Sequence, residues 1–194
     1  MPQAAGPSEG IAFHPLTPER WDDFSALFGP RGACAGCWCM WWRRGRKDYR
    51  AGQGEGNKRA MKALVDSGEI PGILSYVGGK PAGWCALAPR ETYAALARSH
   101  ILKPVDEKPV WSVTCFFIAK GHRRKGLSSK LLEAAVKFAA SRGAKIVEGY
   151  PREPRKADEP EPFLYTGLAS AFRKAGFKEV VRRSETRPIM RQTL

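Results

Sequence analysis

Several features that define whole classes of protein are missing from this chain. No apolar run reaches the roughly 18 residues that a membrane-spanning helix needs. The first ten residues lack the cationic and then apolar order of a signal peptide, and no segment repeats at the period of a solenoid. We therefore expect a cytoplasmic protein with no membrane partner.

Cysteine and histidine are scarce, and their placement limits metal and redox roles. Five cysteines, an odd number, fit a reducing compartment better than a disulfide framework. Cys34, Cys37 and Cys39 offer three thiolates, whereas a structural zinc site takes four ligands, and no second pair follows at zinc-finger spacing. We expect no bound metal and interpret residues 37–42 as core or as an apolar wall beside a ligand. A metal-binding regulator is the alternative that this cluster leaves open.

Acidic residues are too few to balance the basic ones. Against 33 Lys and Arg there are 19 Asp and Glu, which gives a net charge of +14. Such an excess attracts nucleic acid, anionic lipid or a phosphorylated ligand. The cations gather at residues 43–47, 123–125 and 182–191, and only the middle cluster lies in a recognisable ligand geometry. We therefore do not expect a nucleic-acid partner.

The apolar pattern predicts one α/β domain over residues 10–194, preceded by a flexible tail at 1–9. The predicted order is β-α-α-β-β-α-β-α-β-α-β-β, a mixed sheet of about seven strands flanked by helices. The predicted strands are 11–13, 73–77, 81–87, 110–119, 145–150, 177–183 and 187–193, and the helices begin near residues 17, 57, 91, 127 and 164. The strand at 110–119 is nearly all apolar, so we expect it to be central and buried on both faces. Residues 31–56 are expected to be irregular and 151–162 to form a surface loop.

A junction between a strand and a helix carries the clearest functional signal. The apolar strand runs into a basic turn, and the turn opens an amphipathic helix at about 127–142. The first N–H groups of a helix have no internal partner, and the helix dipole favours an anion there. The spacing Arg-x-x-Gly-x-Ser, at Arg123, Gly126 and Ser128, differs from both the P-loop and the Gly-x-Gly-x-x-Gly of a dinucleotide site. The sequence therefore predicts a phosphate site of another kind.

This turn resembles the acyl-CoA pyrophosphate loop of the GNAT superfamily of N-acyltransferases, where the pattern is Arg/Gln-x-x-Gly-x-Gly/Ala. Ser128 is a small departure in size. The triplet at 146–148 and the segment at 171–177 add to the resemblance, which covers residues 70–194 in order of motifs and 10–69 more loosely. It implies splayed central strands that form an acyl-CoA cleft, and acetyl transfer from acetyl-CoA to a primary amine by direct attack. The residues that the resemblance assigns to the cofactor are Phe116, Phe117, Ile118, Arg123, Arg124, Lys125, Gly126, Leu127, Ser128 and Ser129.

The resemblance also implies candidates for the proton transfers. Glu148 matches a family Glu that acts as a base, and its apolar strand would favour the neutral form. The alternative is a structural Glu that faces solvent or pairs with an Arg. Glu91 is a further candidate, and Ser112 stands where other members carry a different Glu. The backbone N–H of Phe116 is the candidate donor for the oxyanion.

The candidate acid departs from the family pattern. The usual Tyr on the last helix is Phe172, which cannot donate a proton. Tyr165, expected earlier on the same helix, or Tyr150 would substitute, unless both are buried aromatics with satisfied hydroxyls. The missing Tyr and the basic charge keep open a non-catalytic module that senses acyl-CoA or binds nucleic acid.

The resemblance leaves the acceptor open as a small-molecule or peptide amine. An edge strand in the C-terminal hairpin would support a homodimer.

Overall fold

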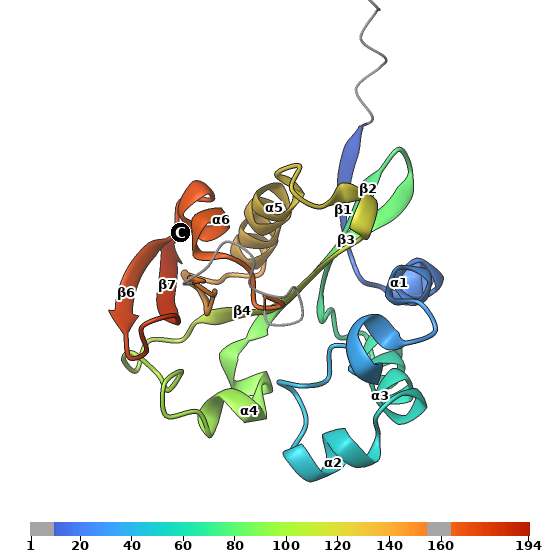
Figure 1. Cartoon of the computed structure of the whole chain (residues 1–194), viewed down its shortest axis with the longest axis horizontal. Coiled ribbons are helices and arrows are strands. Elements are labelled where there is room, and N and C mark those ends of the chain that lie inside the picture. The colour runs from blue at the N-terminus through green and yellow to red at the C-terminus, as the bar shows by residue number, and fades with distance from the viewer. Residues whose placement is uncertain (1–9, 155–163) are drawn as a thin grey trace, which may run out of the picture.

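The computed structural model describes residues 10–154 and 164–194, so the predicted tail and most of the predicted loop at 151–162 lie outside the described residues. The described part contains a seven-stranded sheet in the order β1-β2-β3-β4-β5-β7-β6 (Figure 1). The strands are β1 (Ile11–Pro15), β2 (Gly72–Val77), β3 (Lys80–Pro89), β4 (Trp111–Ile118), β5 (Ile146–Gly149), β6 (Lys178–Arg182) and β7 (Pro188–Thr193). Only β4 and β5 pair in parallel among these strands, and the mixed sheet confirms the predicted fold class.

Helices cover both faces of the sheet (Figure 1). Those with residues in the core of one face are α5 (Leu127–Ser141) and α6 (Ala169–Lys174), and those on the other are α1 (Trp21–Phe28) and α3 (Glu55–Asp66). The short helices α2 (Arg46–Ala51) and α4 (Ala94–Ala97) lie at one end of the molecule in this view. Strand β4 contributes Val113 and Phe116 to one core cluster and Cys115 and Phe117 to the other. The prediction of a central strand buried on both faces is therefore confirmed.

The parallel pairing with β5 covers only the beginning of β4. Strand β4 pairs with β5 only from Trp111 to Val113, although β4 continues to Ile118. The ring of Phe172 packs on the bare backbone of Gly149, where an added Cβ would lie 2.1 Å from the ring carbon Cε1. The same ring meets Phe116 of β4 edge to face, with centroids 5.9 Å apart. This aromatic contact lies where the pairing of the two strands ends. A splay of the strands around an acyl-CoA cleft stays a prediction.

Three local predictions are wrong. Helix α3 begins at Glu55, and Asn57 lies inside it as a fully buried side chain instead of capping it. The last helix begins at Ala169 because Gly167, with φ of +84°, takes the chain out of the helical region shortly before it. The segment 31–56, expected to be irregular, contains α2.

Candidate functional site

The turn between β4 and α5 has the geometry of an anion site. Gly126 precedes α5 with φ of +77°, a left-handed conformation that suits glycine. Within residues 10–154 and 164–194, no side chain caps the start of α5, and its first turn carries no acidic residue. The N–H groups of Leu127, Ser128 and Ser129 are therefore available to an anion. A Cβ at Gly126 would meet no atom within 4 Å, so a ligand can approach the backbone of this residue.

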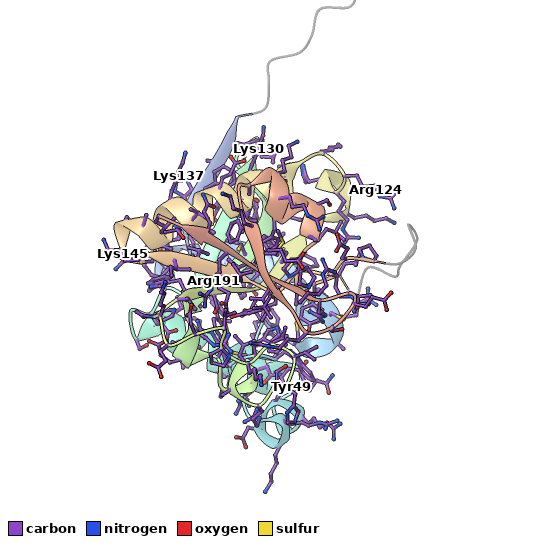
Figure 2. The ribbon with its side chains drawn as sticks, turned by 90° about the vertical axis from the view of Figure 1, so that its left-hand side faces the viewer. Tyr49, Arg124, Lys130, Lys137, Lys145 and Arg191 are labelled. Atoms are coloured by element: carbon purple, nitrogen blue, oxygen red, sulfur yellow. The ribbon has the colours of Figure 1, made fainter. Side chains whose placement is uncertain are left out.

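The basic side chains of this turn divide into one that holds the loop and two that face solvent. The Nε of Arg123 donates to the carbonyl oxygen of Ile118 at 2.8 Å, which fastens the turn to the end of β4. Arg124 and Lys125 are exposed, and Figure 2 shows Arg124 extending from the molecule. Leu127 is buried in the core, so it can offer a ligand only its backbone. The assignment of CoA phosphates to these residues stays a prediction.

The expected oxyanion donor has a partner within the chain. The N–H of Phe116 donates to the carbonyl oxygen of Tyr165 at 2.5 Å. The turn at 164–168 contacts β4 beyond the end of its pairing with β5, and it thereby satisfies a backbone donor that β5 leaves unpaired. The expectation of a free backbone N–H at this position is therefore wrong for the structure as described.

Glu148 lies in a different setting from the one expected. Its side chain is 0% exposed, and its carboxylate accepts hydrogen bonds from Arg191 Nε at 2.7 Å and Arg90 Nη1 at 3.2 Å. The hydroxyl of Tyr150 donates to the same carboxylate at 2.6 Å. The expected apolar surroundings are therefore wrong, and the alternative interpretation, a Glu paired with Arg, describes the geometry. A catalytic role for Glu148 stays a prediction.

The two arginines that bind Glu148 were not predicted from the sequence. Arg191 lies directly opposite Glu148 in the antiparallel pairing of β5 with β7, so the register of the two predicted strands would have revealed it. Arg90 follows the end of β3 and is 58 residues away from Glu148, which leaves no local signal.

The two candidate acids differ in their surroundings. Tyr150 is 0% exposed, its hydroxyl contacts Ser112 at 2.8 Å and also bonds Arg90, and burial raises its pKa. Tyr165 is half-buried and lies in the turn before α6, not on the helix as predicted. Burial raises the pKa of Tyr165, against the opposing effects of Arg187 and Trp41, so the phenol stays protonated at neutral pH. A phenol without this shift is also protonated at neutral pH, so the shift does not single out Tyr165 as a proton donor.

The remaining candidates have structural surroundings. Cys39 is buried and accepts a hydrogen bond from Trp84 Nε1 at 3.2 Å, which places it in the core. Across the described residues, no group of three His, Cys, Asp or Glu is placed to hold a metal ion. Glu91 is exposed in the turn after β3, and Phe172 is fully buried. None of the described helices is both long and apolar enough to pass through a membrane.

The family model described as "Acetyltransferase (GNAT) family" matches residues 38–157. No curated protein matches the chain. Solved structures with the same fold include PaiA N-acetyltransferase from Thermoplasma acidophilum in complex with coenzyme A, with 14% identity, a TM-score of 0.52 and coverage of 95% of this chain and 99% of that one. A GNAT-family acetyltransferase from Listeria monocytogenes has 9% identity, a TM-score of 0.57 and coverage of 95% of both chains.

Aminoglycoside acetyltransferase AAC(6')-Ib in complex with coenzyme A and kanamycin has 15% identity, a TM-score of 0.54 and coverage of 95% of both chains. At these identities the likeness shows a shared fold. The family match covers more than half of the chain and includes the strand β4, the basic turn and α5. The chain therefore belongs to the acetyltransferase (GNAT) family, and it is an acyl-CoA-dependent N-acyltransferase.

Proposed function

We propose that the protein transfers an acetyl group from acetyl-CoA to a primary amine by direct attack, with the CoA pyrophosphate at residues 123–129. The observation that carries this proposal is the start of α5. Its N–H groups have no side-chain cap in the described structure, Gly126 leaves the approach open, and Arg124 and Lys125 are exposed beside it. A diphosphate at this point would gain both hydrogen bonds and a favourable dipole.

The reaction needs two proton transfers. The acceptor amine loses a proton and forms the N–C bond with the thioester carbonyl, after which the C–S bond breaks and CoA leaves as a thiolate that takes up a proton. We propose Tyr165 as the donor of that proton, because its backbone is bonded to Phe116 of β4, which places the residue beside the expected cleft. Glu148 remains our candidate base, acting through the Tyr150 hydroxyl that is bonded to it.

The placement of CoA is tested with a matched pair of glycines. Gly126 and Gly143 both have positive φ, at +77° and +83°, and a Cβ at either would meet no atom within 4 Å. The substitutions Gly126→Trp and Gly143→Trp therefore carry similar backbone strain at opposite ends of α5. We expect calorimetry to show loss of acetyl-CoA binding only for Gly126→Trp. Unchanged affinity in this variant, or equal loss in both, would refute the placement.

Turnover is tested by CoA release from acetyl-CoA in the presence of an amine panel. Cys34 is exposed and would react with a thiol reagent, so CoA is better quantified by mass spectrometry. We expect release that depends on the amine. Acetyl-CoA binding without release across the panel would favour the acyl-CoA-sensing module instead.

A further inference from the structure

A hollow with an unusual lining lies between the segment 41–49 and α4. Its volume is about 420 Å³, and its lining consists of Trp41, Trp42, Arg44, Arg46, Tyr49, Ala95 and Arg98. Three aromatic rings and three guanidinium groups therefore face one space, and no acidic side chain contributes to it. Most of the lining comes from the segment 31–56, for which the sequence predicts irregular structure.

Some arginines of the described structure are paired with carboxylates, and the exposed arginines of this hollow are not. Arg43, Arg90, Arg182 and Arg191 all form ion pairs with carboxylates. Arg46 and Arg98, by contrast, are exposed and have no carboxylate partner among residues 10–154 and 164–194. Like charges that share a small space repel one another, and a bound anion relieves that repulsion.

The buried side chain of Asn57 holds Arg44 in place. Its Nη1 donates to the side-chain oxygen of Asn57 at 3.1 Å, and Asn57 is 0% exposed. The amide nitrogen of Asn57 donates in turn to the carbonyl oxygens of Gly36 at 3.2 Å and Tyr49 at 3.3 Å. One buried amide thus fixes both an arginine and the backbone of Tyr49, so this part of the hollow is formed before any ligand binds.

The aromatic lining offers a flat apolar contact. Trp41 is 42% exposed, although it packs edge to face against Tyr49 with centroids 5.0 Å apart. Trp42 is buried at 8% exposure. An exposed indole beside unpaired guanidinium groups suits a ligand that combines a ring with a negative charge.

The hollow is connected through Tyr165 to the part of β4 that lies beyond its pairing with β5. The ring of Trp42 lies 6.4 Å from that of Tyr165, and the Tyr165 carbonyl is bonded to Phe116 of β4. Figure 2 shows Tyr49 in the lower part of the molecule and Arg124 in its upper part, so the hollow and the phosphate turn occupy different regions of the chain. The three arginines are therefore not needed for the CoA pyrophosphate.

We infer that this hollow binds the acceptor, and that the acceptor is a primary amine that also carries a carboxylate or phosphate group and a flat ring. The inference rests on the proposed function above. A polycationic acceptor, such as the kanamycin bound to the aminoglycoside acetyltransferase, would be repelled by three arginines that no acidic residue of the lining balances.

The test compares acceptors in matched pairs. Phenylalanine and phenylalaninamide share the ring and the amine but differ in the carboxylate, and phosphoethanolamine and ethanolamine differ in the phosphate. A charge-assisted hydrogen bond contributes about 1.5–3 kcal/mol, so we expect KM to be at least about tenfold lower for an anionic member than for its neutral partner. The two pairs distinguish carboxylate from phosphate, and kanamycin is the cationic comparison.

Variants connect the preference to the hollow. We expect Arg46→Gln and Arg98→Gln each to raise KM for the preferred anionic acceptor about tenfold, with kcat and acetyl-CoA affinity unchanged. Arg50→Gln, also exposed on α2 but outside the lining, is the matched control and should leave KM unchanged.

The inference would be overturned by equal KM values within both pairs, or by turnover of kanamycin alone. It would also be overturned if neither anionic acceptor were turned over, or if Arg46→Gln and Arg98→Gln left KM unchanged. Amine-dependent CoA release in any of these cases would leave the proposed function intact. Absence of acetyl-CoA binding by calorimetry would overturn the proposed function itself.

Discussion

Glu148→Gln is the substitution whose effect the structure defines most sharply, because it removes one charge and almost no volume. The carboxylate lies between Arg90 and Arg191 and is 0% exposed. A glutamine has one oxygen to accept with, so its amide N–H₂ must face one of the guanidinium groups. That arginine then lies beside a donor in a site from which water is excluded.

The expected loss of stability follows from the partners that remain. Breaking a buried ion pair costs about 3–5 kcal/mol when the other charge is left uncompensated. Arg191 keeps Asp106, at 2.7 and 3.1 Å, and Arg90 keeps the carbonyl oxygen of Leu102 at 2.7 Å. The cost should therefore lie near the lower limit, about 3 kcal/mol. For a chain of this size, that corresponds to a decrease in Tm of about 6–12 °C.

Thermal unfolding followed by circular dichroism at neutral pH measures this effect. The control is Glu133→Gln, which removes the same charge from the exposed face of α5 and should change Tm by less than about 2 °C. A similarly small change for Glu148→Gln would refute the argument that this carboxylate anchors the arginines. Activity of the variant should be assayed well below its unfolding range, so that loss of a base is not confused with loss of structure.

Three further predictions concern the core. Asn57→Leu leaves two carbonyls and Arg44 without their partner, so we expect the free energy of unfolding to fall by about 3 kcal/mol. Urea unfolding should show a lower midpoint with an unchanged m value, and an unchanged midpoint would contradict the prediction. Gly149→Ala should lower Tm because of the clash with Phe172, and adding Phe172→Leu should restore part of the loss; strictly additive effects would exclude the clash. All five tyrosines have raised pKa values, mainly because of burial. In the unfolded chain these tyrosines ionise near pH 10, whereas in the folded protein they stay protonated to higher pH. Their contribution to the free energy of unfolding is therefore complete below about pH 10 and is lost as pH rises above it. Reversible tyrosinate absorbance near pH 10 with unchanged circular dichroism would contradict this.

The elements that the sequence predicted well are those whose signals are local. Helix α5 has an apolar stripe with a glycine at each end, and it was placed within one residue of its observed bounds. The pair Gly78-Gly79 predicted a tight hairpin, and both residues have positive φ between β2 and β3. Strand β4 was predicted from its apolar run, because a strand that is covered on both faces does not alternate apolar and polar residues.

The elements that were missed depend on contacts distant in sequence. Asn57 has the residue type of a helix cap, but its amide is used by carbonyls 8 and 21 residues away. Residues 33–39 include four non-glycine residues with positive φ, a conformation that no propensity indicates. The same holds for the site: the phosphate turn is one continuous motif, whereas the arginine partners of Glu148 are 43 and 58 residues away.

The hydrogen bond between Phe116 and Tyr165 has a kinetic consequence. A pantetheine arm that pairs with β4 at this position must first displace a carbonyl of the protein itself, so loading becomes an exchange of partners. Acetyl-CoA association would then level off at high ligand concentration, at the rate with which the turn at 164–168 detaches. Pre-steady-state mixing would measure that plateau directly.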